Sequence, residues 1–327
     1  MPVDSADPAL QVHALSVEYA SPAGVSRVVR DVSLAVRRGE CLGIVGESGS
    51  GKSQIVLAVM GLLDAHARTR GSVKFRGEQL LSAPTATLNR LRGAKLAMIF
   101  QDPLAALTPH LKIGVQLGEI LVRHAQMSWR EADERSLAML QRVRIADPKQ
   151  CLRQYPHELS GGMRQRVMIA MSLLCEPDIV IADEPTTALD VTVQAQIVDL
   201  LRAMRQDFQM GLVLISHDLG LIAGLADRIA VVYAGRVVEN LAVADLARSA
   251  RHPYTAALIE CAPTLTGRTQ GRMPTLPGQP PSPETSDEGC AFAPRCARAQ
   301  ARCGVERPTL SPPDAATQVA CHFPLSP

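Results

Sequence analysis

Two stretches near the start of the chain alternate apolar and polar residues, at positions 10–18 and 28–36. Alternation with a period of two is typical of a strand with one buried face, so both are predicted as half-exposed antiparallel strands. The short apolar run at 40–45 then predicts a buried strand, and residues 52–63 repeat with the spacing of a helix.

Strand and helix patterns alternate along much of the remaining chain. Strand patterns recur at 95–100, 178–182, 211–215 and 228–232. Helical patterns lie between them, at 113–123, 130–143, 162–174 and 192–208. This alternation predicts an α/β fold with a parallel sheet, and the consecutive helices between about 112 and 174 indicate a helical insertion into it.

The character of the chain changes after residue 262, where prolines and glycines gather and four cysteines follow. We therefore predict one large domain over 8–262, with a helical subdomain at about 104–174, followed by a Pro-rich linker and Cys-rich extension over 263–327.

Composition narrows the class of protein. The 327 residues are 46% apolar and 20% charged, which suits a packed globular core. The net charge is +2 and the basic residues are spread along the chain, so we expect no nucleic-acid partner. We find no secretory signal, and the apolar runs are too short to cross a bilayer, so a cytoplasmic chain that reaches any membrane through a partner is expected.

One loop carries the strongest chemical signal. The segment GESGSGKS fits the phosphate-loop pattern G-x-x-x-x-G-K-[ST] and lies between a predicted strand and a predicted helix. In such a loop, backbone N–H groups surround phosphate oxygens, the lysine reaches the β- and γ-phosphates, and the final serine ligates Mg²⁺. The predicted nucleotide-binding residues are Gly46, Ser48, Gly49, Ser50, Gly51, Lys52 and Ser53. The alternative is a chance glycine-rich turn, which the strand–loop–helix context disfavours.

The fold class that follows is a P-loop NTPase core with a RecA-like parallel sheet, an antiparallel β subdomain, the helical insertion and the cysteine-rich extension.

Two adjacent acids complete the requirements of a P-loop enzyme. Asp183 and Glu184 end an apolar strand, where a carboxylate can hold Mg²⁺ and its neighbour can accept a proton from an attacking water. A strand that simply ends in a polar turn before Pro185 is the alternative, and the phosphate loop makes it the weaker one.

A second anion site is indicated far from the first. Ser160, Gly161 and Gly162 open an apolar helix within the segment LSGGMRQR. A serine and two glycines at a helix start can bind an anion, although Ser160 could equally be an ordinary N-cap.

From about residue 10 to residue 260, these motifs resemble the ATP-binding cassette family, the motor subunits of ABC transporters. Met163 stands where the family's signature usually has glutamine. The resemblance implies two ATPase subunits facing head to tail, with Ser160, Gly161 and Gly162 capping the γ-phosphate held by the partner's phosphate loop. It also implies that Asp190 crosses the dimer interface.

The same resemblance assigns roles to three further residues. Tyr19 matches the aromatic residue that stacks on adenine, Gln101 matches the glutamine that senses Mg²⁺ and the attacking water, and His217 matches the histidine that contacts the γ-phosphate. The alternatives are a surface strand tyrosine and a structural histidine. Residues 104–114 are the expected contact surface for a membrane permease.

The C-terminal part resembles the oligopeptide, dipeptide and nickel branch of this family, and within it the dipeptide-type ATPase subunit most closely. Its cysteines, at Cys290, Cys296, Cys303 and Cys321, are spaced C-x5-C-x6-C-x17-C. Four thiolates can surround a metal, but the lack of a C-x-x-C pair leaves metal and no metal equally open from spacing alone. The branch implies a [4Fe-4S] cluster, with zinc as the alternative. A structural role is favoured over a redox-sensing one, because nothing in the sequence indicates an electron partner.

We therefore expect an ATPase motor that drives uptake of di- or oligopeptides. The expected partners are a second, related ATPase subunit in a heterodimer, two transmembrane permeases and an extracytoplasmic solute-binding protein, with this chain on the cytoplasmic face of the inner membrane. Nickel, glutathione or another small solute remain alternative cargoes. Two other classes are disfavoured alternatives. An ABC ATPase acting on DNA or ribosomes usually carries a long coiled-coil insertion or a second cassette, and neither pattern is found here. Glu184 and His217 argue against a metal-dependent regulator that binds nucleotide without hydrolysis.

Overall fold

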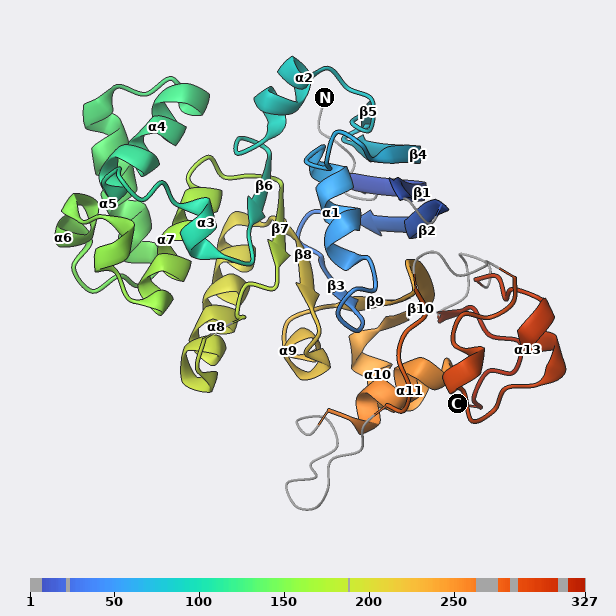
Figure 1. Ribbon diagram of the computed structural model, residues 1–327. Helices are drawn as coiled ribbons and strands as arrows, with labels where there is room; N and C mark the ends of the chain where they lie inside the picture. The colour runs from blue at the N-terminus through green and yellow to red at the C-terminus, as the bar shows by residue number, and fades with distance from the viewer. Residues whose placement is uncertain are drawn as a thin grey trace. The chain divides into compact units, whose positions relative to one another are not determined.

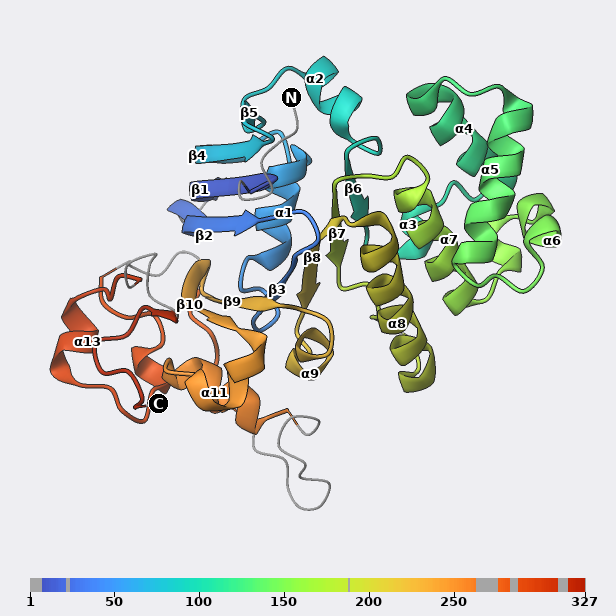
Figure 2. The same cartoon turned by 180° about the vertical axis from the view of Figure 1, so that it is seen from behind.

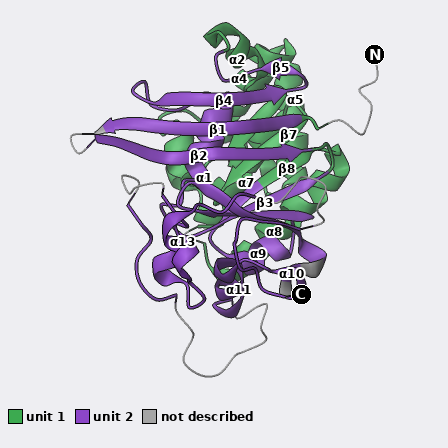
Figure 3. Cartoon of the chain, turned by 90° about the vertical axis from the view of Figure 1, so that its right-hand side faces the viewer, with its two compact units in different colours: residues 1–9, 37–39, 83–213 green, residues 10–36, 40–82, 214–327 purple. Residues whose placement is uncertain are grey.

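The computed structural model describes residues 8–21, 24–187, 189–262, 276–282, 288–310 and 317–326. Two compact units divide the chain (Figure 3): unit 1 comprises residues 1–9, 37–39 and 83–213, and unit 2 comprises residues 10–36, 40–82 and 214–327. These are packing units rather than sequence domains, so the predicted boundary at residue 262 stays a prediction.

Unit 2 contains the antiparallel sheet that the alternating pattern predicts. Strands β1 (Leu10–Ser21) and β2 (Gly24–Val36) pair antiparallel, β4 (Arg68–Phe75) pairs with the other edge of β1, and β5 (Glu78–Gln79) follows. The sheet lies beside helix α1 (Lys52–Met60) in both views of Figures 1 and 2. Its apolar face is formed by fully buried side chains, among them those of Leu15, Val17, Val29 and Val32.

A second set of strands in unit 2 supports the phosphate loop. Strand β3 (Cys41–Val45) pairs in parallel with β9 (Arg228–Tyr233), β9 pairs antiparallel with β10 (Arg236–Ala242), and β10 pairs antiparallel with β11 (Gln318–Val319). The prediction of a parallel sheet is therefore correct for β3 and β9, but the arrangement is mixed. The antiparallel strands β10 and β11 have no counterpart in the sequence prediction. Strand β11 has only two residues, which is too little pattern to detect.

The remaining elements of unit 2 are short. They are α9 (Leu219–Ala223), η2 (Val243–Asp245), α10 (Leu246–Ser249), α11 (Pro253–Glu260), η3 (Ala293–Arg295) and α13 (Ala301–Val305). In the described part of the C-terminal extension, η3 and α13 are short helices and β11 is a strand, and this part lies beside β10 and α11 in Figures 1 and 2. Of the predicted Pro-rich linker, residues 263–275 and 283–287 lie outside the described residues.

Unit 1 combines two parallel strands with helices. Strands β6 (Leu96–Ile99) and β7 (Ile179–Asp183) pair in parallel and every residue in them is buried. The helices are α2 (Thr85–Leu91), α3 (Pro103–Ala106), α4 (Ile113–Ala125), α5 (Trp129–Arg142), α6 (Pro148–Arg153), η1 (Pro156–Glu158), α7 (Gly161–Leu173) and α8 (Val191–Phe208). Helices α4 to α7 gather into one group in both views, as a helical insertion would (Figures 1 and 2).

Strand β8 (Gly211–Ser216) is divided between the two units after Val213. None of the helices in the described part of the chain is both long enough and apolar enough to span a membrane.

Candidate functional site

The phosphate loop connects β3 to α1 in the way its motif requires. Gly51 is the N-cap of α1 and has a φ of 98°, a conformation that side chains with a Cβ rarely adopt. A Cβ at Gly46 would lie 2.1 Å from the carbonyl oxygen of Val232, and one at Gly51 would lie 2.3 Å from that of Val28. Backbone therefore packs so closely against the loop that both positions need glycine.

Lys52 is 5% exposed and its ammonium group lies inside the curve of the loop. Its Nζ donates to the carbonyl oxygens of Gly46 and Glu47, both at 2.8 Å, and to Ser50 Oγ at 3.4 Å. Ser50 is buried, Ser48 and Gly49 are exposed, and Ser53 is partly buried in the first turn of α1. The loop thus concentrates one positive charge and a helix N-terminus at one place, which suits a bound polyphosphate.

Tyr19 lies on β1 close to the same helix. Its hydroxyl donates to Gln54 Oε1 at 2.7 Å, which places the ring beside the first turn of α1. Burial, and the nearby carboxylate of Asp64, raise the pKa of Tyr19 above its ordinary value. The tyrosine is held near the helix that follows the phosphate loop, rather than standing on an open strand surface.

Two residues that the sequence patterns did not single out contact the phosphate loop. The backbone N–H of Glu47 donates to Tyr254 Oη at 2.9 Å, and the Glu47 carboxylate pairs with Arg295 through bonds of 2.6 and 2.9 Å. These partners are 207 and 248 positions away from Glu47 in the sequence. No short-range sequence pattern indicates contacts at such separations. The only sequence signal near Arg295 is the neighbouring cysteine, Cys296.

In unit 1, the predicted catalytic acids end strand β7. Asp183 is buried, and Glu184 follows it with a φ of 46°, in the left-handed region. Gln101 Nε2 donates to Glu184 Oε2 at 3.1 Å, and Thr187 Oγ1 donates to the same oxygen at 2.9 Å. The structure therefore brings Gln101 and Glu184 together and adds Thr187, which the sequence analysis missed.

The signature residues begin helix α7. Ser160 is the N-cap, and its Oγ accepts a hydrogen bond from Met163 N at 3.3 Å. Ser160 and Gly161 are exposed and Gly162 is partly covered. Asp190 likewise caps α8, accepting from Val193 N at 2.9 Å, and is exposed. The capping alternative for Ser160 is thus realised, and it leaves the helix start open to a further partner.

His217 follows β8 and is exposed. It lies in unit 2 with the phosphate loop and Tyr19, whereas Gln101, Asp183, Glu184, Ser160 and Asp190 lie in unit 1.

All eight cysteines are free thiols. The four predicted ligands line one small cavity of about 20 Å³, together with Phe292 and His322. Burial raises the pKa of the Cys290 and Cys321 thiols. Among the residues that the structure describes, however, no group of three or more histidine, cysteine or acidic side chains is arranged to hold a metal ion. The prediction of a metal centre is therefore not supported. His322 Nε2 lies 2.8 Å from the carbonyl oxygen of Glu306, so this ring is engaged by the backbone.

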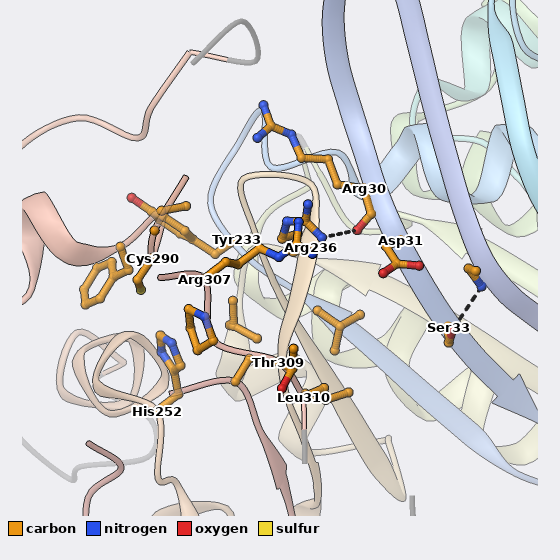
Figure 4. A pocket seen from close by; sticks show the side chains of 18 of the residues that line it. Arg30, Asp31, Ser33, Tyr233, Arg236, His252, Cys290, Arg307, Thr309 and Leu310 are labelled. Atoms are coloured by element: carbon orange, nitrogen blue, oxygen red, sulfur yellow. Dashed lines mark hydrogen bonds between the residues drawn. The ribbon is translucent and has the colours of Figure 1, made fainter. Parts of the chain in front are cut away.

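A larger cavity, of about 290 Å³, separates the extension from strands β1 and β2. Figure 4 shows Arg30, Asp31 and Ser33 on one side of it, with Tyr233, His252 and Cys290 on the other. None of the predicted site residues except Cys290 lines this cavity.

Comparison with known proteins identifies the family. Residues 29–187 match the family described as ABC transporter, and residues 238–303 match the oligopeptide/dipeptide transporter, C-terminal region. The chain is 47% identical to the oligopeptide transport ATP-binding protein OppD of Salmonella typhimurium over 294 residues, covering 90% of this chain and 88% of that one. The chain belongs to the ABC transporter family.

Further relatives support this membership. The OppD protein of Haemophilus influenzae is 46% identical over 91% of this chain and 92% of its own. The dimeric structure of MJ0796, a bacterial ABC transporter cassette, superimposes with a TM-score of 0.65 at 26% identity, over 72% of this chain and 98% of that one. A post-hydrolysis structure of the same cassette, bound to ADP and Pi, gives a TM-score of 0.64 over the same shares. The ABC cassette fold predicted from the phosphate loop is thereby confirmed.

The two family matches cover different parts of the ABC transporter chain. The first spans the phosphate loop, the signature residues and the acidic pair, whereas the second spans Tyr254, Arg295 and three of the four clustered cysteines. Both residues that hold Glu47 therefore come from the region typical of oligopeptide and dipeptide transporters.

Proposed function

We propose that this chain is the ATP-hydrolysing motor subunit of an ABC importer for di- or oligopeptides. The observation that carries the proposal is the 47% identity to OppD over nine tenths of the chain, which includes both the ATP motifs and the C-terminal region. ATP hydrolysis provides the free energy, and the transported peptide never needs to contact this subunit.

ATP binding is assigned to unit 2. Lys52 neutralises the β- and γ-phosphates, and the loop N–H groups of Gly46, Ser48, Gly49, Ser50 and Gly51 surround their oxygens. Tyr19 stacks on the adenine. The support for this assignment is the position of Lys52 inside the loop and of Tyr19 beside α1.

Hydrolysis requires the acidic pair. Asp183, Ser53 and Gln101 provide oxygen ligands of the kind that Mg²⁺ prefers, and the ion, when bound, neutralises phosphate charge. Glu184 accepts a proton from water as the water oxygen bonds to the γ-phosphorus and ADP leaves. His217 contacts the γ-phosphate. The hydrogen bonds from Gln101 and Thr187 hold the Glu184 carboxylate in one orientation for this step.

A second ATPase subunit completes the site. Ser160, Gly161 and Gly162 cap the γ-phosphate bound by the partner's phosphate loop, and Asp190 contacts the partner. Their exposure at two helix starts supports this assignment. Two weak anion sites become one strong site when a polyanion bridges them, so ATP stabilises the pair and hydrolysis releases it. We propose a heterodimer of ATPases below two permeases, on the cytoplasmic face of the membrane, served by an extracytoplasmic solute-binding protein.

We also retain the proposal that Cys290, Cys296, Cys303 and Cys321 hold a [4Fe-4S] cluster that stabilises the extension. Four thiols lining one cavity are a suitable donor set, although the side chains do not form a metal site as they lie. Iron content and the visible spectrum of anaerobically purified protein test this proposal. A brown, iron-loaded sample supports it, and a colourless sample that contains zinc, or no metal, contradicts it.

Uptake of a labelled dipeptide and a labelled oligopeptide tests the proposed function. Cells that lack this chain should lose uptake of at least one of them, and the wild-type chain but not Glu184→Gln should restore it. Unchanged peptide uptake with a loss of nickel or glutathione uptake would overturn the peptide assignment and keep the importer. Unchanged uptake of every solute would favour an ABC ATPase outside transport.

A further inference from the structure

The second residue of the phosphate loop, Glu47, is held from outside the loop by two anchors. Its backbone N–H donates to Tyr254 Oη at 2.9 Å, and both of its carboxylate oxygens accept from Arg295, at 2.6 and 2.9 Å. Glu47 is joined to the phosphate loop on its other side too, because its carbonyl oxygen accepts from Lys52 Nζ at 2.8 Å.

Burial and further hydrogen bonds also hold the Arg295 side chain in place. Its side chain is 4% exposed, and Glu47 is 27% exposed. The guanidinium also donates to the carbonyl oxygen of Pro277 at 2.8 Å and to Tyr233 Oη at 3.2 Å. A bidentate pair of this kind is directional, and removing the arginine leaves the Glu47 carboxylate uncompensated in a partly buried site.

An aromatic cluster supports both anchors. The rings of Tyr233 and Tyr254 lie with their centroids 4.6 Å apart, and Phe292 of the extension packs at 5.3 Å from Tyr233 and 5.4 Å from Tyr254. Tyr233 and Tyr254 are fully buried, so these contacts fix the Tyr254 hydroxyl beside the loop. The extension therefore provides an arginine and an aromatic ring that together hold one wall of the phosphate loop.

We propose that Arg295 is a positioning residue for ATP binding, which neutralises Glu47 and thereby makes the phosphate loop receptive to a triphosphate. The physical reason is electrostatic. A carboxylate one residue from Gly46 would repel a polyanion in the loop, and in a partly buried site water screens that repulsion poorly. Arg295 cancels this charge and binds both carboxylate oxygens at the same time. The C-terminal extension thus has a direct role at the nucleotide site. This role rests on the proposed function of the chain as an ATPase.

The test measures the Kd of a fluorescent ATP analogue for the full chain. Arg295→Ala should weaken binding about tenfold or more, because a charged hydrogen-bonded pair is lost and the loop regains a negative charge. Arg302→Ala is the matched control. Arg302 forms a bidentate pair with Glu306 in the same extension, at 2.6 and 2.8 Å, but its side chain is 56% exposed and this pair does not include the phosphate loop. Its Kd should equal that of the wild type.

A second substitution separates charge neutralisation from folding. In the Arg295→Ala background, Glu47→Gln removes the repelling charge and should recover most of the lost affinity, a rescue that a merely structural arginine would not allow. Arg295→Lys keeps the positive charge but cannot form the bidentate pair. Its Kd for the ATP analogue should lie between those of the wild type and Arg295→Ala. This variant therefore tests the inference even if the alanine variant folds poorly.

Two results would overturn the inference: an unchanged Kd for Arg295→Ala, or an equal loss of affinity with and without Glu47→Gln. A wild-type chain that binds no ATP analogue would contradict the proposed function instead. Binding by the wild type together with an unaffected Arg295→Ala variant would contradict the inference alone.

Discussion

Glu184 has a backbone conformation that few residues other than glycine adopt, with a φ of 46°. Residues held in such conformations often cluster at functional sites, where the surrounding contacts compensate for the strain. Here the contacts are the side-chain hydrogen bonds from Gln101 and Thr187, which fix the carboxylate at the end of β7. The proposed base is thus oriented by its own unit.

The hydrogen bond from Thr187 to Glu184 can be tested by substitution. Thr187→Val keeps the side-chain shape and removes the donor to Glu184 Oε2, so the carboxylate loses one of its two described anchors. We expect the kcat for ATP hydrolysis to fall by about tenfold, the order expected for loss of one hydrogen bond to a charged group, with the KM for ATP little changed. Steady-state kinetics check this. Thr187→Ser restores the hydroxyl and should restore kcat, and a serine variant as slow as the valine variant would argue against the positioning role.

At the scale of the secondary-structure elements, the sequence predicted those with a strong local pattern. Strands β1 and β3 and helices α4, α5 and α8 lie where periodicity placed them. Strand β4 was missed, because RTRGSVKF carries three basic residues and a glycine, and only Val73 and Phe75 turn fully into the core. Strand β11 has two residues and exists through its pairing with β10, a long-range contact that no local pattern encodes.

Helix α5 offers a test of local stability. Ser128 and Glu131 form a capping box, in which each side chain accepts from the other residue's backbone N–H. Ser128→Ala removes one half of it and should lower the free energy of unfolding by about 1 kcal/mol. Arg130→Ala is the control, since its pair with Glu134 is exposed and should contribute only a few tenths of a kcal/mol. Urea denaturation measures both, and equal effects would contradict the capping account.

At the scale of the whole molecule, the sequence predicted the ATP motifs but not what holds them. The phosphate loop is a contiguous segment whose residue types follow from phosphate chemistry, so it could be recognised directly. The contacts of Tyr254 and Arg295 with Glu47 join positions more than two hundred residues apart, so they depend on the folded arrangement of unit 2. The proposed pairing with another ATPase subunit involves contacts between two chains. The exposed residues at the starts of α7 and α8 support this pairing.

Ser160 tests that pairing. Ser160→Asp keeps a good N-cap for α7 but places a carboxylate where the partner's γ-phosphate is proposed to lie. Ser160→Asn has nearly the same shape, also caps, and carries no charge. We expect ATP-dependent association of the ATPase subunits, measured by light scattering, to be lost with aspartate and largely kept with asparagine. Equal association in both variants would contradict the proposed cap.

The central claim is that this chain hydrolyses ATP with Glu184 as the base. The most direct test compares ATP turnover by the wild-type chain and by Glu184→Gln in the assembled transporter, with nucleotide binding measured in parallel. Turnover by Glu184→Gln is expected to fall by about a hundredfold or more while ATP binding persists. Equal turnover in the two proteins would contradict it.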